Sequence, residues 1–150
     1  MPTKVSEYMS PKVIAACEDL GIREAYFQMR ESNIRHLPVK DSDGKLVGIV
    51  SDRELRRPNW VDEAPDLQHQ YELSDDMEVK DIMVRNVHVV HTYDTLSKAV
   101  KLVLEHKIGA LPVLDKNEEL VGMLSSVDLL QALDDIFEES KYDKKVKRAV

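Results

Sequence analysis

Two short motifs in this chain carry side chains that can hold a polar ligand. Ser125 and Asp128 stand three positions apart, and Ser51 and Glu54 repeat that spacing earlier in the chain. A carboxylate offers acceptor oxygens to a pair of neighbouring hydroxyls. A serine at the junction of a strand and a helix lies beside free helix N–H groups, which attract anions. The chemistry indicated is therefore the binding of a hydroxylated or anionic molecule.

Cationic side chains accompany only one of these motifs. Arg35, His36 and Arg53 belong to the copy that contains Ser51. An arginine side chain suits phosphate because its planar guanidinium donates two parallel hydrogen bonds. The alternative is that the two arginines pair with neighbouring acids such as Asp52. The positions that lie 74 residues later carry no charge and are Gly109, Ala110 and Val127.

Signals of catalysis are weak. No nucleophile stands beside an evident general base, and the chain has neither a glycine-rich phosphate loop nor a dinucleotide fingerprint. Cys17 is the only cysteine, and we expect a small buried residue rather than a nucleophile. The sequence therefore favours a binding protein that requires no cofactor over an enzyme. No metal-ligand spacing is found at His69, His88, His91 or His106.

Composition narrows the class of protein further. The chain has 150 residues, of which 43% are hydrophobic, and a formal net charge of −7. That length allows a compact core, and the negative charge argues against a general nucleic-acid binder. No stretch approaches the ~20 apolar residues of a membrane span, and no signal peptide is evident. Together with the single cysteine, these features predict a cytoplasmic protein.

An internal repeat covers most of the chain. The segment Ile34–Val39 (IRHLPV) returns as Ile108–Val113 (IGALPV), 74 positions later. At the same offset, Leu46–Ser51 (LVGIVS) returns as Leu120–Ser125 (LVGMLS). Two copies are too few for a solenoid, so a closed pseudo-symmetric pair is the better interpretation.

Each copy predicts the order strand, helix, strand, strand, helix. Apolar residues recur at helical spacing from Ile22 and from Leu96, and Asp94 or Thr95 can cap the second of these helices. The predicted fold class is α/β (α+β), with two β-α-β-β-α units packed sheet to sheet. The first strands are expected at 13–15 and 87–90, and the hairpins at 37–50 and 111–124. The expected divisions are a first domain at 1–57, a connection at 58–78, a second domain at 79–137 and a charged tail at 138–150.

The helices that close the two copies differ. In the first copy Pro58 interrupts the pattern, because proline cannot continue the helical hydrogen bonds. In the second copy Ser126 is the expected N-cap, and the charged tail is expected to be a solvated helix end. The apolar stripe of this second helix comprises Val127, Leu130, Leu133 and Phe137.

These motifs resemble those of a known family. The pattern I-x-x-L-P-V before each hairpin and G-h-h-S-x-x-[DE]-L after it, where h is apolar, is similar to the CBS domain, named for cystathionine β-synthase. The resemblance covers about 130 residues, as two domains in tandem. Such a pair, called a Bateman module, implies facing sheets and two clefts between the domains. These clefts commonly bind AMP, ADP, ATP, S-adenosylmethionine or NAD.

The resemblance implies roles for particular residues. Asp128 is expected to bind ribose, whereas Glu54 replaces the usual aspartate and is one methylene longer. Gly109 and Ala110 leave room for a flat base, while Arg35 and His36 would face its phosphates. The expected ligand-binding residues are Val13, Ile14, Ile34, Arg35, His36, Ser51, Arg53, Glu54, Val87, His88, Ile108, Gly109, Ala110, Ser125 and Asp128.

The function expected from the resemblance is a stand-alone regulatory module. It would bind an adenosine-containing ligand between its domains, with AMP or ATP foremost and NAD or S-adenosylmethionine as further candidates, and would signal by a conformational change. Because the two copies differ at these positions, one tight ligand per chain is expected. The predicted partners are a second copy of the chain and an unidentified regulated protein, without nucleic acid or membrane. One alternative is an interaction module, in which Glu54 and His88 close the clefts and Trp60 contacts a partner protein. The other is an enzyme that acts on a nucleotide.

Overall fold

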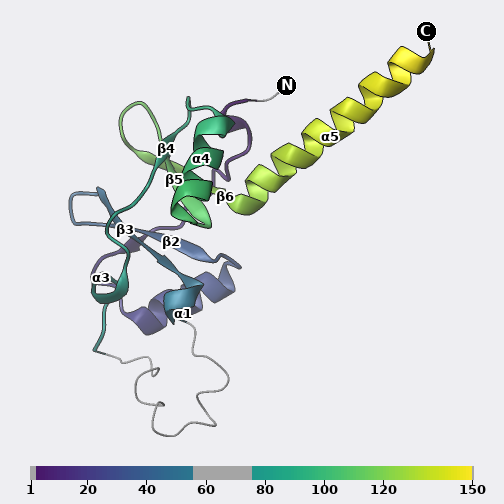
Figure 1. The fold of residues 1–150 in the computed structure, drawn as a ribbon. Helices are drawn as coiled ribbons and strands as arrows, with labels where there is room; N and C mark the ends of the chain where they lie inside the picture. Colours follow the sequence, from purple (N-terminus) through teal and green to yellow (C-terminus); the bar gives the residue numbers. More distant parts are fainter. Residues whose placement is uncertain (1–2, 56–75, 150) are drawn as a thin grey trace, which may run out of the picture. The chain divides into compact units, whose positions relative to one another are not determined.

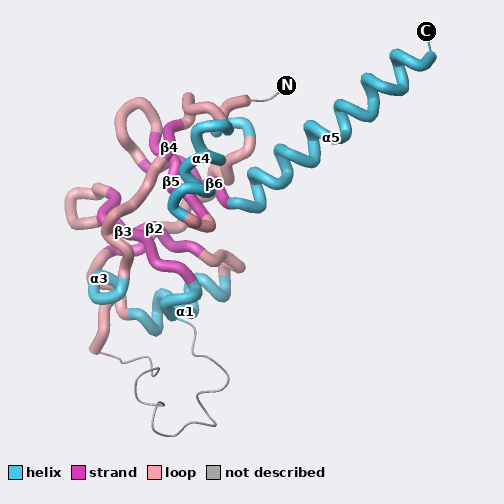
Figure 2. Tube along the Cα trace, viewed as in Figure 1, coloured by secondary structure: helices cyan, strands magenta, loops and turns pink. Residues whose placement is uncertain are grey.

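The computed structural model describes residues 3–55 and 76–149. The chain forms two compact units, of which the first consists of Ile14–Val87 and the second of Met1–Val13 with His88–Val150. Each unit contains a three-stranded sheet and helices (Figures 1 and 2). The predicted class, a repeated unit of mixed α and β structure, is therefore confirmed.

The first unit is built around a sheet of order β1-β2-β3. Strand β1 runs parallel to β2, and β2 forms an antiparallel hairpin with β3. The side chain of Asp41 accepts hydrogen bonds from two N–H groups in the hairpin turn, where Gly44 supplies a φ of 80°. The elements are β1 (Ala16–Cys17), α1 (Ile22–Glu31), β2 (His36–Lys40), β3 (Leu46–Ser51), α2 (Asp52–Leu55) and α3 (Val79–Ile82).

The second unit repeats this plan with a sheet of order β4-β5-β6. Thr95 caps α4 as expected, because its side chain accepts a hydrogen bond of 3.2 Å from the Lys98 N–H. The elements are the 3-10 helix η1 (Val5–Glu7), β4 (Val90–His91), α4 (Leu96–His106), β5 (Ala110–Leu114), β6 (Leu120–Ser125) and α5 (Ser126–Ala149).

Each repeat contributes its first residues to the unit built by the other repeat. Ser10 pairs with Met123 through backbone hydrogen bonds of 2.8 and 3.0 Å. Val84 pairs with Ile49 in the same way, at 2.9 and 3.0 Å. The two pairs are related by the repeat offset, so the exchange is pseudo-symmetric. Each compact unit therefore contains residues of both repeats.

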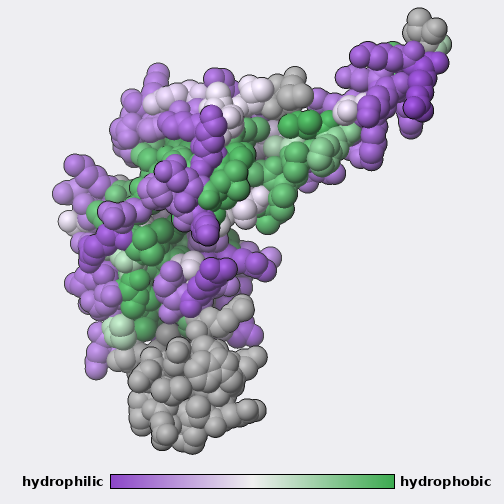
Figure 3. Space-filling view, in the orientation of Figure 1, coloured by the Kyte–Doolittle hydropathy of each residue, from purple (hydrophilic) through white to green (hydrophobic). Residues whose placement is uncertain are grey.

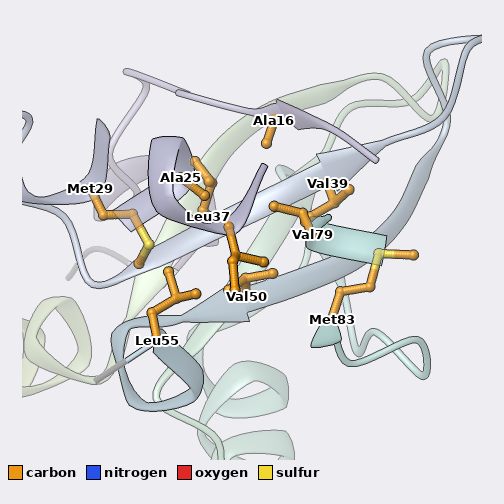
Figure 4. Close-up of a cluster of buried hydrophobic side chains, with 10 residues drawn as sticks. Ala16, Ala25, Met29, Leu37, Val39, Val50, Leu55, Val79 and Met83 are labelled. Carbon is orange, nitrogen blue, oxygen red and sulfur yellow. The ribbon is translucent and has the colours of Figure 1, made fainter. Parts of the chain in front are cut away.

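Each unit has its own apolar core. In the first unit, Leu37, Val39 and Val50 of the sheet pack with Ala25 and Met29 of α1 (Figure 4). Full burial of such a side chain contributes about 1.5–3 kcal/mol. The second core has the corresponding sheet residues and is completed by Val5 from the start of the chain. Its buried members are Val5, Val90, Ala99, Leu111, Val113 and Leu124.

The first strand of each unit lies later than the sequence predicts. The runs at 13–15 and 87–90 are β-prone, but β1 begins at Ala16 and β4 at Val90. Pairing decides this, because Ala16 lies opposite Val39 and Val90 lies opposite Val113, where the parallel ladders begin. The prediction that Cys17 is buried is wrong. It is exposed, because successive strand residues point to opposite faces and Ala16 takes the inward position.

Helix α5 corrects two further expectations. Ser126 is the first helical residue rather than the cap, because Ser125 supplies the capping hydroxyl. The predicted stripe of Val127, Leu130 and its neighbours is exposed, and the buried residue of α5 is Ala132. The helix runs on to Ala149 with residues 138–149 exposed, as expected of a solvated helix end.

Parts of the predicted connection lie outside the described residues. These are residues 58–75, including Pro58, Trp60 and His69. Of the remainder, Met77 accepts a hydrogen bond of 3.1 Å from the N–H of Ile22 and so joins the first unit. The segment that the second repeat contributes to the first unit therefore includes Met77, at the end of the predicted connection, and continues through α3.

Candidate ligand-binding site

Strand register brings the two sequence motifs together within each unit. In the first unit, His36 at the start of β2 lies opposite Ser51 at the end of β3. The N–H of Asp52 donates a 2.9 Å hydrogen bond to the carbonyl of Arg35. The I-x-x-L-P-V motif and the S-x-x-E motif therefore meet at one end of the hairpin. The repeat in the sequence suggests that the two motifs lie close together, and the strand pairing establishes it.

The second unit has the same arrangement with different side chains. Ala110 lies opposite Ser125, and the N–H of Ser126 donates a 2.9 Å hydrogen bond to the carbonyl of Gly109. Gly109 and Ala110 present no charged group here. Gly109 and Ala110 thus stand at the positions equivalent to Arg35 and His36 of the first unit.

Ser125 and Asp128 hold each other in a fixed geometry. The Asp128 carboxylate accepts a 2.8 Å hydrogen bond from the Ser125 N–H through Oδ2. In return, the Ser125 hydroxyl accepts a 3.2 Å hydrogen bond from the Asp128 N–H. This reciprocal cap positions the carboxylate at the start of α5. The Ser125 hydroxyl accepts in this contact, so its own proton is directed elsewhere.

Ser51 and Glu54 interact differently. One oxygen of Glu54, Oε2, accepts a 2.7 Å hydrogen bond from the Ser51 N–H and a second, short one from the Ser51 hydroxyl. The longer glutamate side chain reaches back far enough for one oxygen to accept both hydrogen bonds. The Ser51 hydroxyl therefore donates to its own motif, which Ser125 does not do. The two motifs differ in hydrogen-bonding state as well as in sequence.

A pocket in the first unit contains part of the predicted site. Its volume is about 310 Å³, close to the lower end of the range for ligand pockets. Arg35 and Ile34 line it, as do Arg30 from the end of α1 and Asp52 from the start of α2. Two arginines and one aspartate thus line one hollow. The full lining is Tyr26, Met29, Arg30, Asn33, Ile34, Arg35 and Asp52.

Several of these lining residues are missing from the sequence prediction. Tyr26 and Met29 look like core positions of an amphipathic helix, and only Met29 is fully buried. Asn33 adopts a φ of 53° in the turn that follows α1, which aims the chain into β2. An asparagine directly before the repeated motif is the signal that could have identified this turn.

His36 is partly buried, and this changes its titration. Burial lowers the pKa of the His36 imidazole below its ordinary value, because a charged ring loses solvation. Asp52 and Glu54 oppose this effect, whereas Arg35 and Arg53 add to it. His36 is therefore favoured in its neutral form unless an anion approaches.

The remaining predicted residues are distributed over the two units. Ile14 and Ile34 pack partly buried against the first core, and Ile108 packs against the second. His88 stacks on His106 with ring centroids 3.7 Å apart. Arg53 is exposed and does not line the pocket. Val13 belongs to the second unit and Val87 to the first, and both are partly exposed.

Neither a metal-binding cluster nor a membrane-spanning helix is present in the described part of the chain. Residues 3–55 and 76–149 contain no group of three or more histidine, cysteine, aspartate or glutamate side chains suited to a metal ion. In the same residues, no helix has both the length and the apolar character needed to cross a bilayer.

The comparison with protein families decides the membership of this chain. The family model described as the CBS domain matches residues 5–58 and again residues 79–135. The chain belongs to the CBS domain family. The resemblance that the repeated motifs carry is thereby confirmed, and the tandem arrangement is that of a CBS pair.

Solved CBS pairs share this fold over nearly all of their length. CBSX2 in complex with AMP superimposes with a TM-score of 0.70 at 26% identity, covering 90% of this chain and 98% of that one. The CBS domain pair of protein MJ0100, in complex with 5'-methylthioadenosine and S-adenosyl-L-methionine, gives a TM-score of 0.72 at 27% identity. That match covers 89% of this chain and 98% of the other.

Curated relatives fall into two kinds. A CBS domain-containing protein of Dictyostelium discoideum is 33% identical over 144 residues, covering 92% of this chain and 96% of that protein. A homoserine O-acetyltransferase of Methanohalobium evestigatum is 32% identical, but the match covers 89% of this chain and only 24% of the enzyme. This chain thus spans about a quarter of that relative, so the match is no evidence of acetyltransferase activity in this chain.

Proposed function

We propose that this CBS pair is a regulatory module that binds an adenosine-containing ligand. The observation that carries the proposal is the reciprocal Ser125–Asp128 cap, which holds a carboxylate and a serine hydroxyl at the start of α5. Solved relatives of the same fold hold AMP, or 5'-methylthioadenosine and S-adenosyl-L-methionine. Adenosine is the part that these ligands share.

Asp128 is the proposed ribose-binding residue. A ribose diol donates two hydroxyl hydrogen bonds, and a carboxylate accepts them. The described hydrogen bonds of Asp128 use its Oδ2 atom, so Oδ1 is the oxygen proposed to meet the diol. The Ser125 hydroxyl can donate to a phosphate oxygen, since in the cap it acts as an acceptor.

A phosphate-bearing ligand is favoured by the first unit. Arg30 and Arg35 both line its pocket, and guanidinium groups bind phosphate through parallel hydrogen bonds. His36 begins the adjacent strand and would gain a proton near an anion. The arginines therefore favour the phosphate-bearing candidates AMP, ATP and NAD over S-adenosylmethionine, and we keep AMP or ATP as the foremost ligands expected from the sequence. The proposed binding residues remain those named from the sequence, with Arg30, Asn33 and Asp52 added.

Regulation requires that the ligand distinguish between conformations. A ligand shifts an equilibrium only by its differential affinity for the two states. The Ser51 hydroxyl already donates a hydrogen bond to a neighbouring carboxylate, whereas the Ser125 hydroxyl accepts one. This difference supports unequal ligand affinities at the two motifs. One tight ligand per chain is therefore the proposed stoichiometry.

Titration calorimetry with AMP, ATP, NAD and S-adenosylmethionine tests the proposal. Asp128→Asn keeps an acceptor for the Ser125 N–H but removes the charge, and it should weaken binding at least tenfold. The matched control is Asp134→Asn, an exposed aspartate on the same helix that should bind normally. No heat with any of the four ligands at millimolar concentration, or equal affinity of the Asp128→Asn protein, would overturn the proposal.

A second candidate function is that of an interaction module without a ligand. Two observations favour it: Glu54 is hydrogen-bonded to Ser51, and His88 is covered by the His106 ring. In either case we propose that two copies of the chain associate, because α4 and α5 expose large apolar side chains. Light scattering tests the association, and calorimetry separates the two functions, since only the regulatory module binds nucleotide.

A further inference from the structure

Charge is segregated along helix α5. Residues 126–140 contain five acidic side chains and no basic one, whereas residues 141–148 contain five basic side chains and a single acidic one, Asp143. The second stretch is therefore strongly positive in a chain whose net charge is −7. We call its five basic residues the basic end of α5. They are Lys141, Lys144, Lys145, Lys147 and Arg148.

The helix dipole explains only part of this positive charge. Lys147 and Arg148 lie in the last turn of α5, where cations interact favourably with the free carbonyl groups. That effect falls off within one turn, so it does not explain the three earlier lysines. Lys141 forms an ion pair of 2.9 Å with Glu138. Within the described residues, the other four side chains of the basic end form neither an ion pair nor a hydrogen bond, so they are available to an anionic partner.

Most of the basic end lies on one face of α5. Four of its residues recur at a spacing of three and four, which places their side chains side by side along the helix. At a rise of 1.5 Å per residue they extend over about 10 Å. These four are Lys141, Lys144, Lys145 and Arg148. Tyr142 and Val146 share a neighbouring face and are 68% and 45% exposed.

The basic end is separated from the charges of the folded core. Residues 138–149 are all exposed, and Figure 3 shows a hydrophilic surface at this end of α5. This stretch of helix is about 18 Å long at the usual rise per residue. The Debye length at physiological ionic strength is about 8 Å, so the acidic side chains of the core are largely screened from the far end of the helix. The local positive field therefore persists although the chain as a whole is acidic.

The composition of the basic end suits an anionic lipid surface. Four of its five cations are lysines, which act as hydrated point charges, whereas arginine is preferred where nucleic acids are recognised. A membrane presents a plane of anionic head groups, which several lysines on one helix face can meet at once. Clusters of four to eight Lys or Arg on a helix are typical of binding to such lipids. Tyr142 adds an aromatic ring of the kind that lies at head-group level.

We propose that the basic end of α5 docks the protein on anionic phospholipid surfaces. The contact is peripheral and requires no spanning helix. A membrane partner is not expected from the sequence, because the net charge of a chain does not report the local arrangement of its charges. The basic end lies beyond residue 135, where the CBS family match ends, and contains none of the proposed ligand-binding residues. Docking and nucleotide binding can therefore be tested separately.

Co-sedimentation of the full-length chain with phospholipid vesicles tests the docking. The chain should bind vesicles rich in phosphatidylserine but not vesicles of phosphatidylcholine alone, and added salt should weaken the binding because it screens the charges. Each basic residue near an anionic surface changes the affinity about fivefold. The triple variant Lys144→Gln, Lys145→Gln and Arg148→Gln should therefore bind about a hundredfold more weakly. All three side chains are exposed, so the fold should persist.

The matched control neutralises three exposed lysines elsewhere and should bind the vesicles as the native chain does. It carries Lys45→Gln, Lys101→Gln and Lys116→Gln. Equal binding to the two kinds of vesicle, or undiminished binding by the triple variant of the basic end, would overturn the proposal. Binding of the chain to duplex DNA but to neither kind of vesicle would also overturn it. Calorimetry should give the triple variant the nucleotide affinity of the native chain, which shows that it is folded and separates this test from that of the proposed function.

Discussion

The thioether of Met83 packs against Gly48, in the space that a side chain at residue 48 would need. Met83 follows α3, in the segment that the second repeat contributes to the first unit, and Gly48 lies in β3. The repeat produces the same contact in the second unit, where a Cβ at Gly122 would lie 2.7 Å from the Met9 sulfur. These glycines are therefore needed for close approach rather than for an unusual backbone angle.

Replacement of either glycine by alanine should destabilise the protein. Overpacking of a filled site costs about 1–3 kcal/mol. Gly122→Ala should cost more than Gly48→Ala, because its Cβ would also lie 2.9 Å from the Ser10 carbonyl oxygen, which is held in backbone pairing. Urea unfolding measures both free energies. The control is Gly21→Ala, since nothing lies within 4 Å of the added Cβ and little change is expected. Equal stability of all three variants would contradict this account of the exchange.

Shortening Glu54 should make the first motif resemble the second. In the native chain the Glu54 carboxylate accepts a hydrogen bond from the Ser51 hydroxyl. Glu54→Asp withdraws the carboxylate by one methylene, so the hydroxyl becomes available to a ligand. We expect calorimetry to show a second AMP-binding event or a higher apparent affinity. Glu54→Gln keeps the length of the side chain and should show no such gain. An unchanged stoichiometry in Glu54→Asp would argue against competition between Glu54 and the ligand.

The stability of the protein should depend on the protonation of His36. Burial lowers the pKa of this histidine from its ordinary value of 6.5, so the unfolded chain binds a proton more readily than the folded one. The resulting contribution is complete above about pH 6.5 and is lost as the pH falls through the window between that value and the lower folded pKa. Unfolding free energies of the native chain should therefore decline more steeply below pH 6.5 than those of His36→Gln. Parallel curves for the two proteins would contradict the assignment.

Alkaline titration should single out Tyr8. Its hydroxyl donates a hydrogen bond of 2.5 Å to the Asp135 carboxylate and so links the start of the chain to α5. This bond is the main cause that raises the Tyr8 pKa from 10.0 to about 12. Because the folded pKa is raised, the contribution to stability is present below pH 10 and is lost as the pH rises towards 12. The absorbance of tyrosinate should show one late-titrating tyrosine, absent in Tyr8→Phe and shifted to lower pH in Asp135→Asn. A late step that persists in Tyr8→Phe would assign it to another residue.

Much of the fold was predictable because it is encoded locally and then repeated. The spacing from Ile22 and from Leu96 indicates amphipathic helices, and the recurrence of L-P-V with the hairpin residues indicates the two β2-β3 and β5-β6 pairs. The S-x-x-[DE] motif marks the end of a strand and the start of a helix. Side-chain spacing and turn chemistry act over a few residues, so a pattern that occurs in both copies predicts the same element twice. The family membership follows from the same motifs.

Only the tertiary structure decided which parts of the chain share a core. Nothing near Val5 or Val79 in the sequence shows that each segment packs with the other repeat, because that choice depends on contacts between distant residues. The side of α5 that is buried is a second case. The spacing of Val127, Leu130 and Leu133 predicts an apolar face that packs, but in the structure Ala132 is buried and Leu130 is exposed. Whether a serine hydroxyl donates to its carboxylate, as Ser51 does, depends on side-chain reach in three dimensions.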